Sequence, residues 1–216
     1  MKAEVTATDS SSRCPLLLLL LSGLLWLVAA SALALVASLQ LRTPSFLAGC
    51  SFLTYGRMSA MAETAFVYGW MANAGLALAL WTLGRLAGEP LRAQNWAIGG
   101  ALFWNLGVTG AVVGIAVGDA TGFALLGLPK YVQFVMFASY AAIAVSGLLA
   151  WSGRLREVSY ASQWYAAAAL FLFPWILSIA HVMLFSVPAR GVLQPIIAGW
   201  YAQSAWTLWL APLAIS

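Results

Sequence analysis

The sequence predicts an all-α integral membrane protein, built as one bundle of six transmembrane helices. The ten basic and six acidic residues of the 216-residue chain are clustered, and they leave six long uncharged blocks at residues 14–41, 64–84, 93–118, 131–153, 158–189 and 191–216. Each block can supply the roughly 20 apolar residues that cross a bilayer core as a helix. Inside lipid, only helices and closed barrels pair every backbone N–H and C=O group.

The composition supports a chain that lies in the lipid bilayer. Hydrophobic residues make up 63% of it and charged residues 7%, and the mean hydropathy is +0.91. These values exclude an ordinary water-soluble domain. The formal net charge of +4 comes from isolated Lys and Arg residues that form no basic stripe, so we expect no nucleic-acid partner.

The first helix is expected at residues 15–41, which begin with a run of leucines. A cleaved signal peptide over residues 15–40 is the alternative, because small residues lie within it. An uncharged stretch of about 25 residues is too long for an ordinary signal-peptide core, so we interpret it as a helix. Cys14 and Cys50 flank this helix, which places them on opposite membrane faces and forbids a disulfide between them.

The segment at residues 42–62 is too polar and too interrupted to span, and we expect it to lie at the membrane interface. Helices two to six are expected at residues 63–86, 94–118, 131–151, 163–187 and 194–214. Their short connections allow only antiparallel neighbours, so residues 1–216 should form a single compact domain.

Basic residues indicate how the bundle is oriented. Six fall on the side of the N-terminus (Lys2, Arg13, Arg85, Arg92, Arg154 and Arg156) and four on the other side (Arg42, Arg57, Lys130 and Arg190). The positive-inside rule then places both termini in the cytoplasm. Four tryptophans near predicted helix ends, where indole rings prefer the headgroup level, agree with these spans: Trp81, Trp96, Trp151 and Trp164.

Two ionisable residues within the predicted spans have more than one interpretation. Glu63 opens the second helix, where the helix dipole favours a carboxylate, and it serves either as a helix-start residue or as a proton or partner contact. His181 is the only histidine. It either forms a hydrogen bond to a neighbouring helix or binds a cofactor by ligating a heme iron.

Uncharged polar residues within the spans are expected to pack the bundle. Asn73, Asn105 and Gln203 are suited to hydrogen bonds between helices, and the many glycines allow helix backbones to approach closely. The sequence contains no zinc-site spacing, nucleophile–base pair or phosphate-binding glycine loop. We therefore assign no catalytic residue and no metal site.

Five short segments resemble one known family. They are residues 55–58 (YGRM), 65–70 (AFVYGW), 163–165 (QWY), 173–175 (FPW) and 200–209 (WYAQSAWTLW). In order and spacing they are similar to the catalytic subunit I of heme-copper oxidases, especially the cbb-type cytochrome c oxidases and their nitric-oxide-reductase relatives. The resemblance covers nearly the whole chain, and it implies the fold of the first six of that subunit's twelve helices.

The chain departs from this family where the family binds metals. Aligned on Arg57 and Ala65, the position of the family's low-spin heme ligand is Ala62, and the position of its copper ligand is Gln203. An alanine methyl group has no lone pair and an amide is a poor substitute for imidazole. The resemblance therefore implies that this chain alone binds neither heme nor copper at these positions, and leaves heme to the other chains of a complex.

The leading interpretation is a catalytically inactive membrane subunit that acts as a scaffold in a larger respiratory or electron-transfer complex of the bacterial inner membrane. Its partners would be other membrane subunits, and Glu63, Asn73 and Gln203 would line a proton, quinone or partner path. One alternative is half of a split oxidase or reductase whose metal sites lie on a partner chain. The other is a small transporter or channel, although the sequence has no inverted repeat.

Overall fold

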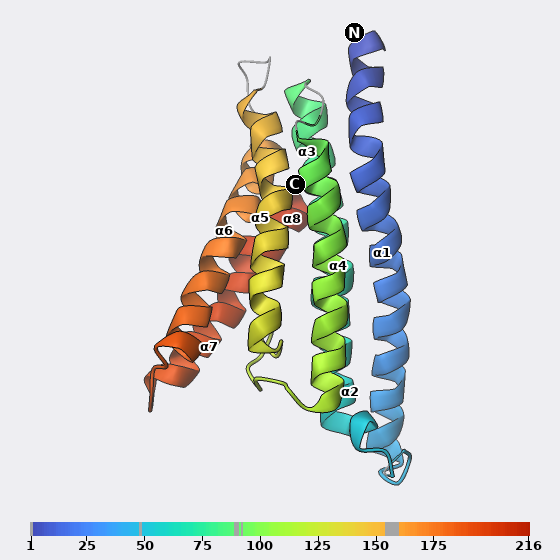
Figure 1. The fold of residues 1–216 in the computed structure, drawn as a ribbon, viewed down its shortest axis with the longest axis vertical. Helices are drawn as coiled ribbons and strands as arrows, with labels where there is room; N and C mark the ends of the chain where they lie inside the picture. Colours follow the sequence, from blue (N-terminus) through green and yellow to red (C-terminus); the bar gives the residue numbers. More distant parts are fainter. Residues whose placement is uncertain (1, 48, 89–90, 92, 154–159) are drawn as a thin grey trace.

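The computed structural model describes residues 2–47, 49–88, 91, 93–153 and 160–216, and the regular structure in these ranges is helical throughout. The chain runs back and forth through the bundle, and successive passes alternate in direction (Figure 1). The elements are α1 (Lys2–Arg42), the 3₁₀ turn η1 (Ser51–Leu53), α2 (Tyr55–Thr64), the π-helix η2 (Ala65–Met71), α3 (Ala72–Ala87), α4 (Gln94–Val117), α5 (Lys130–Ser152), α6 (Ala161–His181), the π-helix η3 (Val182–Ser186), α7 (Leu193–Ser204), the π-helix η4 (Ala205–Leu210) and α8 (Ala211–Ile215).

Five helical segments of the described chain are long and apolar enough to cross a membrane: Ser12–Arg42, Tyr55–Ala87, Gln94–Val117, Lys130–Ser152 and Ala161–Ser186. The prediction of an all-α protein with several helices long and apolar enough to span a membrane is confirmed. The sixth expected span is also helical, over residues 193–215. It is less apolar than the others, because Gln194, Gln203 and three tryptophans lie within it.

Two helix boundaries differ from the sequence-based expectation. α1 begins at Lys2 and not at residue 15, with Pro15 inside it, because the missing N–H of one proline does not stop the helix from continuing on both sides. The second pass begins at Tyr55 and not at residue 63. Its first turn is held by the Arg57 guanidinium, which donates to the carbonyls of Ser51 at 2.8 Å and Ala116 at 2.9 Å.

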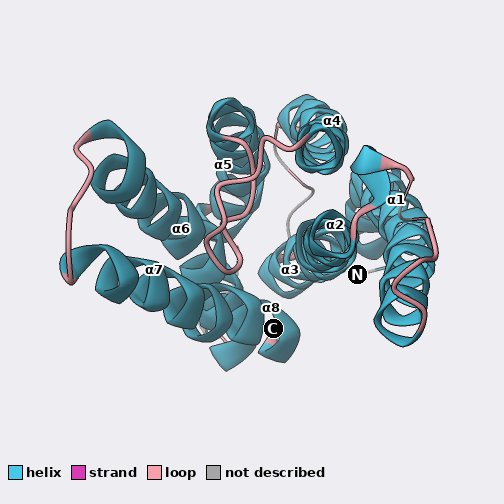
Figure 2. Ribbon diagram, turned by 90° about the horizontal axis from the view of Figure 1, so that it is seen from below, coloured by secondary structure: helices cyan, strands magenta, loops and turns pink. Residues whose placement is uncertain are grey.

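The passes pack closely in the middle of the bundle. α1 lies against α2, η2, α3 and α4, and α5 lies between α4 and α6 (Figure 2). At the α4–α5 contact, a Cβ on Gly100 would lie 2.7 Å from the backbone oxygen of Ser139. Gly100 thus allows an approach that any larger residue would prevent.

The two ends of the chain lie on the same end of the bundle. The Thr82 hydroxyl in α3 donates to the backbone oxygen of Ser216 at 3.3 Å, and Arg85 lines a surface pocket together with Arg13 of α1. Trp151 and Trp164 meet at this end too, with ring centroids 4.8 Å apart. Of the other basic residues used for the orientation, Arg92, Arg154, Arg156 and the side chain of Lys2 lie outside the described residues.

Candidate functional site

His181 lies at the end of α6, in a hydrogen-bonded chain that fixes its protonation pattern. Its Nδ1 is 2.9 Å from Oε1 of Gln133 in α5, and Nε2 of Gln133 donates to the Leu128 carbonyl at 3.0 Å. Because the Gln133 amide nitrogen is directed at Leu128, its oxygen faces the imidazole. His181 therefore donates from Nδ1–H, and in the neutral imidazole Nε2 carries the lone pair.

A cavity of about 180 Å³ adjoins this imidazole, lined by Gln133, Phe134, Phe137, Leu177, Ser178, His181 and Val182. The Phe134 ring packs edge-on against the imidazole at 4.5 Å, and Phe185 packs at 5.5 Å. Lys130 Nζ lies 5.3 Å from the Phe185 ring centroid. Phe134 is 63% exposed and Val182 48% exposed, so the cavity opens on the outer surface of the bundle.

This geometry bears on both interpretations of His181. The hydrogen bond between neighbouring helices is present, because Gln133 belongs to α5 and His181 to α6. The adjoining cavity of about 180 Å³ is smaller than the roughly 300 Å³ at which pockets for drug-sized molecules begin. Heme ligation by His181 stays a prediction.

Glu63 lies at a second, smaller cavity of about 130 Å³, which is covered by the loop between α4 and α5. Its Oε1 accepts the backbone N–H of Leu125 at 3.3 Å, and Leu125 has a positive φ of 56°. The Leu125 carbonyl in turn accepts the Tyr68 hydroxyl. The oxygens of Tyr68 and Tyr201 are 2.9 Å apart, so polar contacts lead from exposed Glu63 to two buried phenols.

Aromatic side chains fill the centre of the bundle. Trp104 packs against Tyr68, Tyr140 and Phe173, and the rings of Phe173 and Trp209 are 3.9 Å apart. Each buried polar atom among them is paired: Trp104 Nε1 donates to the Tyr68 carbonyl at 3.0 Å, Trp209 Nε1 to the Tyr140 hydroxyl at 3.1 Å, and that hydroxyl to a carbonyl of α6 at 3.1 Å. Because the aromatic rings fill the space and the buried polar atoms are hydrogen-bonded, the centre of the bundle has the properties of a packed core.

The three residues of the expected path have separate surroundings. Glu63 lies at the loop cavity, and Asn73 is buried where it hydrogen-bonds to Asn105. Gln203 is exposed on the outer side of α7. Sequence reasoning did not single out Tyr68, Tyr201 or Gln133, although Tyr68 and Tyr201 lie within the segments 65–70 and 200–209 that carried the resemblance.

The positions of the two family metal ligands also lie apart from one another. Ala62 is 8% exposed in α2, and Gln203 faces outward from α7. Within the described part of the chain, no group of three His, Cys, Asp or Glu side chains is placed to hold a metal ion. The residues present do not fit the heme and copper of the resembled family.

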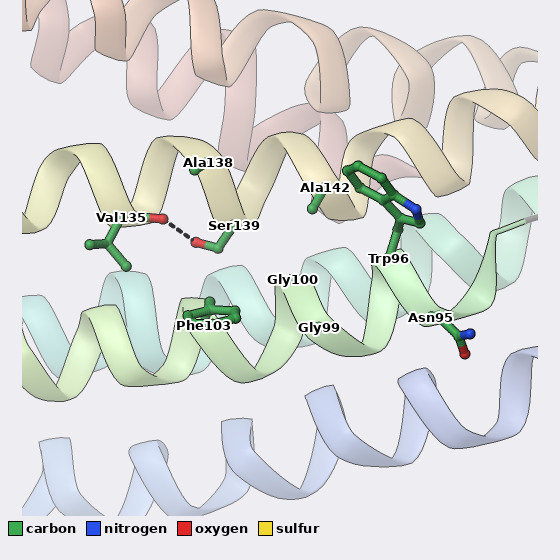
Figure 3. A pocket seen from close by; sticks show the side chains of 9 residues that line it. All are labelled: Asn95, Trp96, Gly99, Gly100, Phe103, Val135, Ala138, Ser139 and Ala142. Carbon is green, nitrogen blue, oxygen red and sulfur yellow. Dashed lines mark hydrogen bonds between the residues drawn. The ribbon is translucent and has the colours of Figure 1, made fainter.

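A groove of about 550 Å³ lies between α4 and α5, lined among others by Trp96, Gly99, Phe103 and Ser139 (Figure 3). The Ser139 hydroxyl already donates to the Val135 carbonyl at 2.6 Å. Phe103 and Trp96 are exposed along it. The groove therefore presents an apolar surface and no reactive group.

No protein-family model matches this chain, and no curated protein matches it.

Proposed function

We propose that this chain is a catalytically inactive membrane subunit, with the fold of the N-terminal half of a heme-copper oxidase subunit I, that serves as a scaffold in a larger respiratory or electron-transfer complex. The observation that carries this proposal is the exposure of two tryptophans in the middle of their passes. Trp175 in α6 is 55% exposed, and Trp206 in η4 is 45% exposed.

Tryptophan is poorly suited to such a position against lipid. Indole rings prefer the headgroup level, where the N–H group finds an acceptor. In the hydrocarbon core an unpaired N–H costs free energy, because no water replaces the lost hydrogen bond. The indole nitrogens of Trp175 and Trp206 have no acceptor within the described residues, and a neighbouring subunit can supply one.

The two passes that carry Trp175 and Trp206 bear further exposed aromatic side chains. Trp164 and Phe171 lie on α6, Trp200 lies on α7, and α6 packs against α7 and η4. Figure 2 shows α6 and α7 side by side at one edge of the molecule. In the resembled family, six helices are half of a closed ring of twelve, so one flank of this half would face other helices.

The residues at the family's metal positions support a chain without catalysis of its own. Ala62 offers no donor atom, and Gln203 offers an amide on the outer surface. The aromatic core leaves the centre of this bundle filled. Scaffolding needs only a stable fold and a partner surface, and both are compatible with these features.

Site-specific photo-crosslinking in native membranes tests the proposal. A photoreactive phenylalanine analogue at position 206 should capture a stoichiometric membrane partner that co-purifies with the chain. The matched control is the same analogue at position 103 in α4, where the side chain is also exposed but belongs to another face. Capture at both positions alike, or at neither, would contradict a specific partner surface on α6 and η4.

The same preparation separates the scaffold from the split enzyme. If the captured partner is a histidine-rich chain of about six helices, and the complex has heme absorbance and reduces oxygen or nitric oxide, the split-enzyme alternative replaces the scaffold. If removal of this chain makes the complex dissociate while the separated partner subunits keep their activity, the scaffold is supported.

A further inference from the structure

We propose that the pocket between α1 and α3 binds the head group of an anionic phospholipid, of which phosphatidylglycerol is the simplest example. The pocket has a volume of about 440 Å³ and lies beside the end of α3. It is lined by Ser12, Arg13, Leu16, Leu17, Trp81 and Arg85. The lipid is inferred from these residues alone, independently of the resemblance to oxidases and of the scaffold.

The pocket attracts negative charge. Arg13 and Arg85 are the charged residues of its lining, and both side chains are exposed. A guanidinium carries five N–H donors in a planar fork that matches the oxygens of a phosphate. Arg85 can therefore keep a contact within the protein and still bind a phosphate. Two arginines on neighbouring helices favour a ligand with a phosphate group.

The two helices also place basic and apolar residues in the same order. α1 and α3 pack against each other and run in opposite directions (Figure 1). In α1, Leu17 lies one turn further into the span than Arg13, and in α3, Trp81 lies one turn further in than Arg85. This turn is roughly 6 Å along each helix axis. Both walls of the pocket therefore change from basic to apolar in one direction, as a phospholipid changes from its phosphate to its acyl chains.

The apolar part of the pocket can be reached from the bilayer. Leu17 is 46% exposed and Trp81 is 49% exposed, so both lie on the outer surface, which meets lipid in a membrane-spanning bundle. Indole rings prefer the headgroup level of a membrane, and this preference places the pocket at the depth of lipid phosphates. A soluble anion would contact only the arginines, whereas a phospholipid also removes the two apolar side chains from water. The pocket therefore favours a lipid over a free phosphate.

Native mass spectrometry of the full chain, released from detergent, counts the lipids that stay bound. Dioleoyl-phosphatidylglycerol and dioleoyl-phosphatidylcholine are offered at equal concentrations. We expect one phosphatidylglycerol to be retained, at least about tenfold more than phosphatidylcholine, because two basic residues contact its head group. An excess of glycerol phosphate, which carries the charge without acyl chains, should not displace it. Equal retention of the two lipids, or displacement by glycerol phosphate, would overturn the proposal.

Paired substitutions test whether the two arginines select the lipid. Arg13→Gln combined with Arg85→Gln should abolish the preference for phosphatidylglycerol. The matched control is Arg42→Gln combined with Arg190→Gln, which removes two exposed positive charges outside the pocket and should leave the preference unchanged. An equal loss in both pairs would show that the whole basic chain attracts anionic lipid, and it would refute the site.

A single substitution at Arg13 gives a second test if the paired variant does not fold. Arg13→Gln should weaken the retention of phosphatidylglycerol roughly fivefold, the contribution of one basic residue at an anionic membrane surface. Circular dichroism in detergent should show unchanged helicity, because Arg13 is an exposed side chain. Unchanged retention by a folded Arg13→Gln variant would contradict the site.

Discussion

Asn73 of α3 and Asn105 of α4 face each other and exchange amide hydrogen bonds, at 3.2 Å from Asn73 Nδ2 and 3.1 Å from Asn105 Nδ2. α1 joins the same network, because Trp26 Nε1 donates to the Asn105 oxygen at 2.9 Å and Ser22 approaches the Asn73 oxygen at 3.4 Å. The network links three passes. It holds α1 in place although much of that helix is exposed.

Replacing Asn105 by leucine should destabilise the bundle by about 1–2 kcal/mol, because the Asn73 amide and the Trp26 N–H lose partners together. Unfolding in sodium dodecyl sulfate, followed by circular dichroism, measures this loss. The matched control is Asn95→Leu at the exposed start of α4, which should change stability by less than about 0.5 kcal/mol. Equal effects of the two variants would mean that the network contributes little.

Gly69 in η2 should not tolerate even a methyl group. A Cβ there would lie 2.5 Å from Cγ of Trp26, and the indole cannot retreat without losing Asn105. Gly69→Ala should cost about 1–3 kcal/mol by overpacking. Gly99→Ala meets nothing within 4 Å and should be neutral or slightly stabilising. Thermal melting of the two variants in the same detergent compares them, and a neutral Gly69→Ala would contradict the close approach of α1.

The phenols of Tyr68 and Tyr201 should respond unequally to loss of the hydroxyl. Tyr68 donates to the Leu125 carbonyl, which leaves Tyr201 to donate to the Tyr68 oxygen. Tyr68→Phe therefore leaves the Leu125 carbonyl and the Tyr201 hydroxyl without their hydrogen-bond partner, and it should lower the free energy of unfolding by about 1–3 kcal/mol. Tyr201→Phe leaves the Tyr68 hydroxyl still donating to the Leu125 carbonyl, so it should lower the free energy of unfolding by about 1 kcal/mol or less. Chemical unfolding of both variants gives the order, and the reverse order would show that the donor assignment is wrong.

The six passes could be predicted because charge is nearly absent from them, and a membrane helix needs little else from its sequence. The start of the second pass was misplaced because Arg57 interrupts an uncharged block. Its guanidinium donates to the carbonyls of nearby Ser51 and of Ala116, which is 59 residues away, and no local sequence pattern predicts the contact with Ala116.

The candidate site was predictable only in part. His181 was singled out because ionisable residues are rare in spans. Its partner Gln133 lies 48 residues away and is one of several glutamines, so only the packing of α5 on α6 selects it. The pairing of Tyr68 with Tyr201, 133 residues apart, depends in the same way on the completed bundle.

The purified chain should have no heme absorbance and no stoichiometric copper. Ala62 and Gln203 lack suitable donors, and one histidine cannot supply two axial imidazoles. Oxidised and reduced absorption spectra, with metal analysis, measure this directly. A stoichiometric b-type spectrum that disappears in His181→Ala would instead make His181 a heme ligand and would contradict the inactive-subunit proposal.

The two native cysteines can report the orientation of the bundle. Cys14 is exposed in α1, Cys50 is half-buried beyond its other end, and both are free. With both termini in the cytoplasm, a membrane-impermeant maleimide added to intact spheroplasts should label Cys14→Ser, which retains Cys50. It should label Cys50→Ser, which retains Cys14, only after the inner membrane is permeabilised.

The opposite labelling pattern would place both termini outside the cytoplasm. It would then contradict the positive-inside bias, which is six basic residues against four. Labelling of both variants from outside would mean that α1 does not span the membrane, and a mature protein that begins beyond Cys14 would mean that the first block is a cleaved signal peptide.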